Sequence, residues 1–527
     1  MRVLIADPIA PEGADALRNH GVEIDVRTGL SADQLAEDIK EFDGLIVRSE
    51  TQVTERVLGA GTRLQVVGRA GVGVDNIDVE AATRLGVAVV NAPSSNTIAA
   101  AEHTLGLILS LARHIPQAHG VLKAGRWERR SFMGIELMGK TLGIVGLGRI
   151  GTEVARRASG FGMRIIGFDP FISNEQANHI GVELHGFDEV VRESDFLTLH
   201  VPLADGTHHL IGTEQLAAMK QGSFLVNCAR GGLIDEDALD RSLEAAHLAG
   251  AALDVFAVEP PGDISLLRHS NLVTTPHLGA STAEAQAGVA REVAEQIVDV
   301  LEGRTPRYSV NAPLVPPETY TELAPYIPVA LAAGRLASQM VEGQPSGLAI
   351  TYQGEVAQYE TAILRAAVLR GFLERSSGER INLVNASTAA QRRGLRVDEH
   401  KTDDMGGSQF SNLLRLDVRA SGGDTIVAGS LTQNEVHIVQ IDAYRVDIVP
   451  TGGPWMVVGH TDRPGMIGEI GTITGKNDIN IASMQVSRER SRGPAMTVLG
   501  LDEGLRPDQL DAIRSIPGAE RVLVVNL

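Results

Sequence analysis

The sequence predicts an α/β protein with two parallel-sheet domains, an α+β domain and a small C-terminal domain. Residues 2–90 alternate short apolar runs with amphipathic stretches, which is typical of parallel βαβ units. Residues 142–169 read as a strand, a glycine-rich turn, a helix and a second strand. Residues 455–527 follow the order βαββαβ. We therefore expect two Rossmann-like or flavodoxin-like domains with a cleft between them, and a ferredoxin-like domain at the C-terminal end.

The first domain is expected to be discontinuous in sequence. A chain of 527 residues suggests three or four domains of ordinary size. A long helical segment over about Thr97–Ala124 precedes the glycine-rich turn. A second helix over Ser281–Glu302, with a Ser281-Thr282-Ala283-Glu284 cap, can return the chain to the first domain, and Gly303–Pro317 serves as a proline-bearing linker. The predicted domains are residues 1–96 completed by about 281–316, residues 97–280, residues 318–452 and residues 455–527.

The third predicted domain mixes helices and strands and carries no catalytic motif that we can name. Helices are expected over Pro328–Met340 and Glu360–Arg375. Strands are expected over residues 413–420, 424–431 and 437–449.

Composition and charge exclude several classes of partner. We find no secretory leader and no run of 18 apolar residues, so we expect a cytoplasmic protein. The one cysteine, Cys228, cannot form an intrachain disulfide and excludes a cysteine-type zinc site, and we expect no metal. The formal net charge of −19 argues against nucleic acid and anionic membranes as partners. An anionic ligand would require a local cluster of arginines.

The glycine-rich turn has the pattern of a dinucleotide site. Gly146 permits the tight turn, Gly148 lets the backbone approach a pyrophosphate, and Gly151 lets helix and strand pack closely. The helix N-terminus then faces the phosphates. Asp169 ends the following strand, where it can accept hydrogen bonds from the adenosine ribose. An acid at this position favours NAD over NADP, because a 2′-phosphate would meet a carboxylate.

Three residues that suit acid–base and anion chemistry follow different strands of the same predicted sheet. Arg230, Glu259 and His277 stand near carboxyl ends, which border the ligand crevice in such folds. Oxidation of a secondary alcohol needs a base for the hydroxyl proton, and histidine suits that role. Glu259 would fix the tautomer of His277, and Arg230 can bind a carboxylate bidentately. Each residue taken alone is better explained as part of a turn or of the solvated surface. The functional interpretation depends on all three together.

Three segments resemble the signatures of the D-isomer-specific 2-hydroxyacid dehydrogenases. They are NCARGGLIDEDAL at 227–239, DVFAVEPP at 254–261 and TPHLGAST at 275–282. The resemblance covers about residues 1–315 and implies that Arg230, Glu259 and His277 are catalytic. It implies an NAD site that contains Gly146, Gly148, Arg149, Ile150, Gly151, Asp169, Pro202, Thr207, Cys228, Ala229, Asp254, His277 and Gly279.

Further motifs within this resemblance imply a phosphorylated substrate. They are VRSETQVT, GRAGVGVDNIDV, NAPSSNTIAAAEHT and GRWERRSFMGIEL, which lie between residues 47 and 137. The implied substrate contacts are Arg48, Ser49, Arg69, Gly71, Val72, Gly73, Asn96, Arg230 and, from a neighbouring subunit, Arg129. A substrate with both a carboxylate and a phosphate needs more cationic donors than Arg230 supplies. Arg48 and Arg69 could instead pair with surface acids.

The resemblance thus implies NAD-dependent oxidation of a small phosphorylated 2-hydroxy acid. One alternative is an unphosphorylated substrate, as in a hydroxypyruvate or glyoxylate reductase. Another is a non-catalytic NAD-sensing protein. A neighbouring subunit that contributes Arg129 implies at least a homodimer, and we expect a homotetramer.

The C-terminal half resembles regulatory modules. Residues 455–527 are similar to an ACT domain, and residues 318–450 to the allosteric substrate-binding domain of long members of the family. The ACT resemblance implies a possible L-serine effector site between two subunits, at positions His460, Asp462 and Asn480. In the third domain, Arg445 is a weak candidate for an anion contact. Both regions could instead serve oligomerisation alone.

Overall fold

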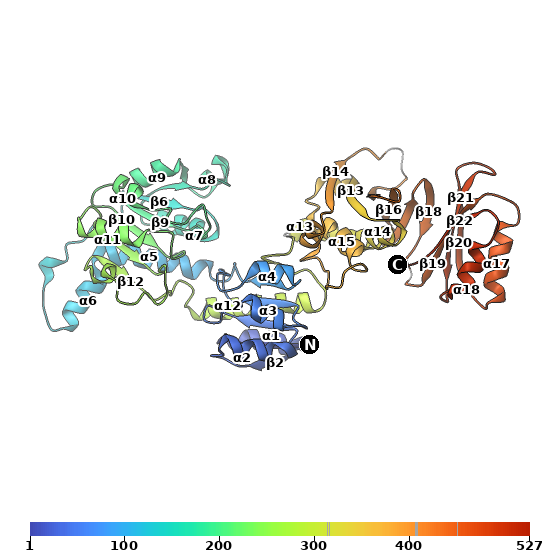
Figure 1. Cartoon of the computed structure of the whole chain (residues 1–527). Coiled ribbons are helices and arrows are strands. Elements are labelled where there is room, and N and C mark those ends of the chain that lie inside the picture. The colour runs from blue at the N-terminus through green and yellow to red at the C-terminus, as the bar shows by residue number, and fades with distance from the viewer. Residues whose placement is uncertain (314, 316, 406–408, 451) are drawn as a thin grey trace.

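The computed structural model describes residues 1–313, 315, 317–405, 409–450 and 452–527. Leu314 and Pro316 of the predicted linker lie outside the described residues. Within these ranges the strands form four sheets, and the predicted α/β fold class is confirmed (Figure 1). Among the described residues, no helix combines the length and the apolar composition that a membrane crossing requires.

The first lobe contains a parallel sheet with helices on it. Its strands are β1 (Arg2–Ile5), β2 (Glu23–Val26), β3 (Gly44–Val47), β4 (Val66–Arg69) and β5 (Ala88–Asn91). Its helices are α1 (Pro11–Asn19), α2 (Ala32–Asp38), α3 (Glu55–Ala60) and α4 (Val79–Arg84), with a short 3-10 turn at Ile39–Glu41. The strand order β2-β1-β3-β4-β5 is flavodoxin-like. Apolar side chains on both faces, such as Leu4 and Ile46, are fully buried, as a parallel sheet requires.

The chain returns to this lobe after leaving it. Helix α12 (Ala283–Leu301) packs across the sheet so closely that a Cβ atom on Gly68 would lie 2.6 Å from Cγ2 of Val293. Beyond α12, the Val310 N–H donates to the carbonyl oxygen of Val89 at 2.7 Å, beside β5. Figure 1 shows α12 in the first lobe, where it packs beside α1 on one face of the sheet.

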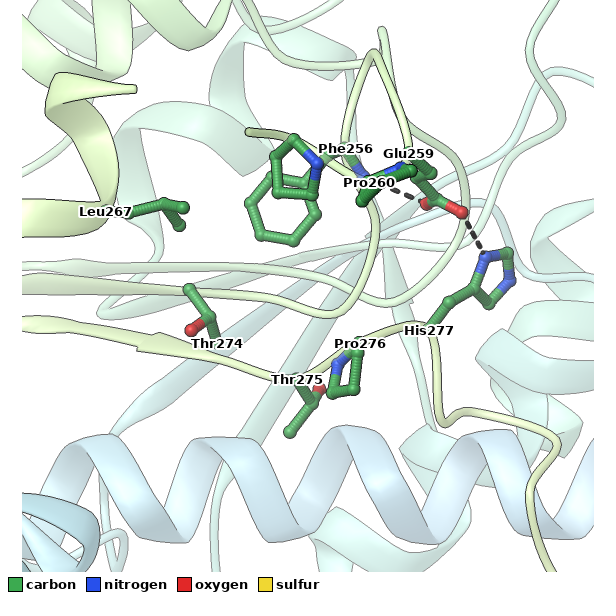
Figure 2. Close-up of a pocket in the computed structure, with 9 residues that line it drawn as sticks. Phe256, Glu259, Pro260, Leu267, Thr274, Thr275, Pro276 and His277 are labelled. Carbon is green, nitrogen blue, oxygen red and sulfur yellow. Dashed lines mark hydrogen bonds and ion pairs between the residues drawn. The ribbon is translucent and has the colours of Figure 1, made fainter. Parts of the chain in front are cut away.

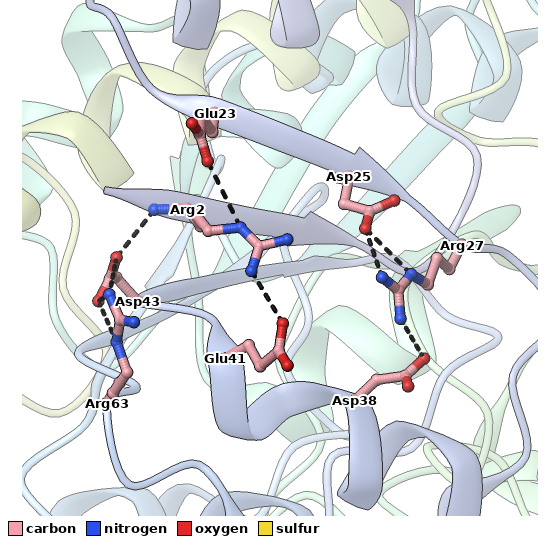
Figure 3. A network of polar contacts seen from close by, with 8 residues as sticks. All are labelled: Arg2, Glu23, Asp25, Arg27, Asp38, Glu41, Asp43 and Arg63. Atoms are coloured by element: carbon pink, nitrogen blue, oxygen red, sulfur yellow. Dashed lines mark hydrogen bonds and ion pairs between the residues drawn. The ribbon is translucent and has the colours of Figure 1, made fainter.

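Ion pairs surround β1 and the edge strand β2 (Figure 3). The Arg2 guanidinium lies 2.9 Å from a carboxylate oxygen of Glu41. Arg27 bridges Asp25 at 2.5 Å and Asp38 at 2.9 Å, and its hydrogen bond holds the pKa of Asp25 below the usual value. Exposed ion pairs add little net stability. Charges on an edge strand do discourage pairing with another chain.

The second lobe contains the glycine-rich turn. Its strands are β6 (Thr141–Val145), β7 (Arg164–Phe168), β8 (Glu183–Leu184), β9 (Phe196–Leu199), β10 (Phe224–Asn227), β11 (Gly250–Leu253) and β12 (Leu272–Thr274). Its helices are α5 (Thr97–Arg113), α6 (Ile115–Lys123), α7 (Arg149–Ser159), α8 (Asn174–His179), α9 (Phe187–Glu193), α10 (Thr213–Ala218) and α11 (Glu236–Glu244), with short 3-10 turns at Arg129–Ser131 and Ser265–Arg268. The strand order β8-β7-β6-β9-β10-β11-β12 is Rossmann-like and reverses between β6 and β9.

The predicted helix over Thr97–Ala124 is broken into α5 and α6. His114 adopts a left-handed conformation, with φ of 52° and ψ of 36°, between the two helices. Pro116 explains the break, because its ring excludes a hydrogen bond to the carbonyl of Ala112 four residues earlier. That carbonyl instead accepts the N–H of Ile135 at 2.9 Å. The predicted helical segment is therefore present, with one interruption at His114.

The third domain is a mixed sheet covered by helices. Its strands are β13 (Pro345–Gly354), β14 (Arg396–Thr402), β15 (Asn412–Ala420), β16 (Thr425–Thr432), β17 (Glu435–Ile441) and β18 (Tyr444–Ile448), in the order β14-β13-β15-β16-β17-β18. Its helices are α13 (Pro317–Leu323), α14 (Ile327–Met340), α15 (Ala362–Leu373) and α16 (Ala386–Arg392), with 3-10 turns at Ala324–Tyr326 and Glu355–Gln358. The strand predicted over residues 437–449 is a hairpin, which turns at Asp442 with φ of 51°.

The C-terminal domain has the predicted ferredoxin-like topology. Its strands are β19 (Pro454–Thr461), β20 (Ile481–Arg488), β21 (Pro494–Leu501) and β22 (Ala519–Asn526), and its helices are α17 (Met466–Lys476) and α18 (Pro507–Arg514). The strand order is β20-β21-β19-β22. Met456 and Val458 face the two helices, whereas Trp455 and Val457 join the core of the third domain. The sheet is therefore covered on both faces within one chain.

The third domain contacts the first lobe near Gly86, which follows α4. Nδ2 of Asn382 donates to the carbonyl oxygen of Gly86 at 2.6 Å, and Arg380 donates to Oε1 of Gln65 at 3.2 Å. Gly86 follows α4 with φ of 70°, and a Cβ atom there would lie 2.9 Å from Nδ2 of Asn385.

Candidate functional site

The glycine-rich turn joins β6 to α7 at the point where the strand order reverses. A Cβ atom on Gly146 would lie 2.5 Å from the carbonyl oxygen of His200, and one on Gly151 would lie 2.0 Å from the carbonyl oxygen of Gly146. A Cβ atom on Gly148 would meet no atom within 4 Å among the described residues. The turn is thus packed against the sheet and open toward the crevice, which fits the diphosphate of a dinucleotide.

Asp169 lies directly after β7, beside this turn. One carboxylate oxygen accepts the N–H of Leu147 at 2.9 Å, and the other accepts the N–H of Phe171 at 2.9 Å. Each oxygen keeps a second lone pair, so the carboxylate can accept a ribose hydroxyl. The residues present therefore fit an NAD molecule.

The remaining predicted cofactor residues follow neighbouring strands of the second lobe. Pro202 and Thr207 follow β9, Cys228 and Ala229 follow β10, Asp254 follows β11, and Gly279 follows β12. Burial raises the pKa of the Cys228 thiol to about 12, so this thiol is neutral near pH 7. The carboxyl ends of these strands border the crevice in which NAD binds in this class of fold.

Glu259 and His277 form a hydrogen-bonded pair at the crevice (Figure 2). Nδ1 of His277 lies 2.8 Å from Oε2 of Glu259, and Oε1 of Glu259 accepts the N–H of Phe256 at 3.1 Å. The carboxylate fixes the tautomer that carries hydrogen on Nδ1, so Nε2 has a lone pair for a substrate proton. Apolar residues line a cavity of about 370 Å³ on one side of the pair, among them Phe256 and Leu267.

Asp254 braces the loop that carries His277. His277 has a left-handed backbone with φ of 55°, which is uncommon for a residue with a side chain. Its N–H donates to the carbonyl oxygen of Asp254 at 2.8 Å. The fully buried Asp254 carboxylate accepts the N–H of Leu278 at 2.7 Å and that of Gly279 at 2.8 Å.

Two side chains complete the environment of Asp254. Thr275 Oγ1 donates at 2.6 Å, and Nε2 of His103 on α5 lies 3.2 Å from the same oxygen. Burial alone would raise the pKa of Asp254, but these hydrogen bonds outweigh it and hold the pKa below the usual value. The sequence analysis assigned Asp254 to the cofactor and overlooked His103. The structure adds for Asp254 the role of holding the His277 backbone.

A second cavity, of about 300 Å³, lies between the two lobes on the polar side of the pair. It brings together predicted substrate and catalytic residues from both lobes. The lining residues predicted from sequence are Arg48, Ser49, Arg69, Gly71, Val72, Gly73, Asn96, Arg230, Glu259 and His277. Ser281 and Gln286, near the start of α12, also line it and were overlooked.

The loop that carries Arg48 is fixed by two buried residues that the sequence analysis missed. The Asp7 carboxylate, at the end of β1, accepts the N–H of Arg48 at 2.5 Å and the hydroxyl of Thr51 at 2.5 Å. Asn76 donates to the carbonyl oxygens of Arg48 at 2.7 Å and Thr51 at 2.6 Å. Asp7 follows the first strand of a parallel sheet, and this position was the one feature of the sequence that could have marked it as part of the site. These bonds fix the backbone of Arg48, which lines the cavity.

Arg69 and Arg230 face the same cavity. A Cβ atom on Gly71 would lie 1.7 Å from an Arg69 nitrogen, and one on Gly73 would lie 2.3 Å from an Arg230 nitrogen. A side chain at either position would compete with the neighbouring guanidinium group for this space. Nε of Arg69 is buried and has no hydrogen-bond partner within the described part of the chain, whereas Arg230 lies 3.4 Å from Asp75.

Burial and the neighbouring Arg230 charge lower the pKa of Arg69 to about 10. A bound anion would relieve both effects. The Oδ1 atom of Asn96 is also buried, with no hydrogen-bond partner among the described residues. The cavity thus presents three guanidinium groups, those of Arg48, Arg69 and Arg230, beside a histidine base.

Arg129 lies elsewhere in the same chain. It belongs to a largely exposed arm, residues 125–138, and does not line the cavity described above. The arm exposes Trp127 at 81%, Met133 at 85% and Met138 at 76%. The role predicted for Arg129 requires a neighbouring subunit.

The three residues predicted for an effector do not meet within one chain. His460 is buried and its Nε2 lies 2.8 Å from Thr497 Oγ1. Asp462 accepts hydrogen bonds from the N–H of Arg492 and the side chain of Arg488, which hold its pKa below the usual value. Asn480 precedes β20, at the opposite end of the sheet, where it donates to Asp502 at 2.6 Å.

Comparison with known proteins gives the family. Residues 105–279 match the model of the NAD binding domain of D-isomer specific 2-hydroxyacid dehydrogenases, and residues 322–442 match that of the D-3-phosphoglycerate dehydrogenase intervening domain. A D-3-phosphoglycerate dehydrogenase of Synechocystis is 44% identical over all of this chain and 95% of its own length. The chain belongs to the D-3-phosphoglycerate dehydrogenase family. This confirms the resemblance to the 2-hydroxyacid dehydrogenases.

Another relative supports this membership, and a solved structure is similar to part of the chain. A D-3-phosphoglycerate dehydrogenase of Methanocaldococcus jannaschii is 44% identical, with full coverage of both chains. A crystal structure of a Thermus thermophilus protein matches 59% of this chain and all of its own, with 36% identity and a TM-score of 0.55.

Proposed function

We propose that this chain catalyses the NAD-dependent oxidation of D-3-phosphoglycerate to 3-phosphohydroxypyruvate, the first committed step towards L-serine. The observation that carries this proposal is the inter-lobe cavity, where Arg48, Arg69 and Arg230 surround a space bordered by the His277–Glu259 pair. At pH 7 the substrate carries one carboxylate charge and about −1.5 to −2 on its phosphate. Three guanidinium groups balance a charge of that size.

The charged residues of the cavity have separate roles in this reaction. NAD, when bound, supplies the hydride acceptor. Nε2 of His277 accepts the proton of the substrate hydroxyl, and Glu259 stabilises the resulting imidazolium through Nδ1. Arg230 holds the carboxylate and the developing carbonyl oxygen, while Arg48 and Arg69 bind the phosphate end. The same groups serve the reverse reaction.

Quaternary structure and regulation are part of the proposal. The exposed Trp127 and Met133 on the arm support its burial against a second copy, which would also bring Arg129 to the neighbouring phosphate. Asn480 lies far from His460 in one chain, so a serine site built from both would form between C-terminal domains of two chains. We expect at least a homodimer, and the cytoplasmic location stays a prediction from sequence.

The test compares phosphorylated and unphosphorylated substrates. NADH formation is followed with D-3-phosphoglycerate and with D-glycerate, each with and without L-serine. We expect kcat/KM at least about 100-fold higher for D-3-phosphoglycerate, because each charge-assisted contact to phosphate contributes about 1.5–3 kcal/mol. Equal values would indicate a hydroxypyruvate or glyoxylate reductase, and binding without turnover would indicate an NAD sensor.

A further inference from the structure

Two arginines contact one aromatic ring at the border of the lobes. Cζ of Arg149 is 5.0 Å from the ring centroid of Tyr308, and Cζ of Arg307 is 5.2 Å from the same centroid. Arg149 is part of the glycine-rich turn of the second lobe, whereas Tyr308 belongs to the segment that returns to the first lobe. The contact between Arg149 and Tyr308 therefore crosses from one lobe to the other.

The backbone of Tyr308 is fixed to the first lobe. Its N–H donates to Oε1 of Gln296 at 2.7 Å, and Gln296 is 3% exposed on α12. Nε2 of Gln296 donates to the carbonyl oxygen of Asn91 at 2.6 Å, and the Asn91 side chain donates to the carbonyl oxygen of Val72 at 2.6 Å. The backbone of Tyr308 is thus linked by hydrogen bonds to the substrate loop that contains Val72.

The charge around this ring is unbalanced. Neither Arg149 nor Arg307 has an ion pair within 4 Å in the part of the chain that the structure describes, although Arg304 in the same segment pairs with Asp299 at 2.8 Å. Two like charges on one ring repel each other, and the N-terminus of α7 adds positive potential beside Arg149. An anion at the glycine-rich turn would relieve this repulsion.

We propose that Tyr308 is a positioning residue that holds Arg149 toward the diphosphate of the cofactor, and that Arg307 completes this phosphate site from the first lobe. The inference rests on the proposed NAD dependence. Because Tyr308 is fixed to the first lobe, the cofactor's phosphate site depends on both lobes being together. The fixed ring also keeps the long Arg149 side chain near the turn before the cofactor arrives.

The proposal is tested by titrating the full-length chain with NADH and following its fluorescence. Tyr308→Leu removes the ring and is expected to weaken NADH binding about two- to fivefold, the range of a partly exposed cation–π contact. Tyr308→Phe keeps the ring and should restore the dissociation constant of the unaltered chain. Arg307→Ala should weaken binding, whereas Arg304→Ala, in the same segment but already paired, serves as the matched control.

The decisive measurement is the double variant Arg149→Ala, Tyr308→Leu. If the ring acts through Arg149, the double variant binds NADH no more weakly than Arg149→Ala alone. Additive losses, or an unchanged dissociation constant in Tyr308→Leu, would overturn the positioning role. Thermal melts check folding, and the exposed Arg307→Ala keeps the test valid if Tyr308→Leu does not fold. An unaltered chain that fails to bind NADH would instead refute the proposed NAD dependence.

Discussion

At the level of single residues, the proposed reaction depends on the base at position 277. Replacing His277 with asparagine removes the lone pair at the position of Nε2 while preserving a similar polar volume. We expect His277→Asn to lower kcat by about 10²- to 10⁴-fold, the usual contribution of a positioned acid–base group. NADH affinity, measured by fluorescence, should stay near that of the unaltered chain. Unchanged turnover would remove His277 from the reaction.

Arg69 predicts how substrate affinity changes at alkaline pH. Burial and the charge of Arg230 lower the pKa of Arg69 to about 10, so its positive charge is present below that pH and is lost above it. The KM for D-3-phosphoglycerate should therefore rise as the pH increases from about 9 to 11. The dissociation constant of NADH serves as the control, and a KM that stays flat over this interval would contradict the prediction.

The residues that line the cavity could be predicted from the sequence better than the residues whose hydrogen bonds fix the surrounding loops. Arg230 and His277 follow strands of a recognisable sheet, so their common location could be inferred. Asp7, Asn76 and His103 act through backbone atoms or through another side chain, and a sequence contains no pattern for such distant hydrogen bonds.

At the level of elements, the hydrogen bonds between Asp254, which follows β11, and the loop after β12 should contribute measurably to stability and activity. Four donor groups now point at the Asp254 carboxylate. In Asp254→Asn, an N–H₂ group would replace one acceptor oxygen and leave some of these donors without a partner. Each unmatched buried donor costs about 1–3 kcal/mol, so we expect a lower melting temperature and a reduced kcat. The control is Asp240→Asn, which also loses a histidine partner, at 2.6 Å, but lies on α11. Equal effects of the two variants would refute the brace.

Elements with clear periodicity were predicted well, and the errors have physical causes. The helix predicted over Ser281–Glu302 spans Ala283–Leu301, where the cap is Thr282, whose hydroxyl accepts the N–H of Ala285 at 3.2 Å. Strand β13 was overlooked although Leu348 and Ile350 alternate with more exposed residues. Strand β14 is polar and lies at the sheet edge, so neither face shows an apolar pattern.

For the whole molecule, a substitution at Gly86 tests how much the contact between the third domain and the first lobe contributes to keeping the two together. Gly86→Ala would place a methyl group 2.9 Å from Asn385 and disturb the hydrogen bond from Asn382. We expect faster proteolysis between residues 303 and 317. Gly21→Ala is a matched control, because Gly21 has φ of 72° but no neighbour within 4 Å among the described residues. Equal cleavage rates would show that backbone strain alone is responsible.

The discontinuous first lobe constrains how the cavity opens. The backbone passes between the lobes near residues 92–96 and again near residues 280–282, before α5 and α12 respectively. The two crossings are two hinge segments, because twisting or sliding of one lobe relative to the other would stretch the backbone at one of them. We therefore expect the cavity to open by rotation about the line that joins the crossings. Product would leave through the side of the cavity farthest from that axis.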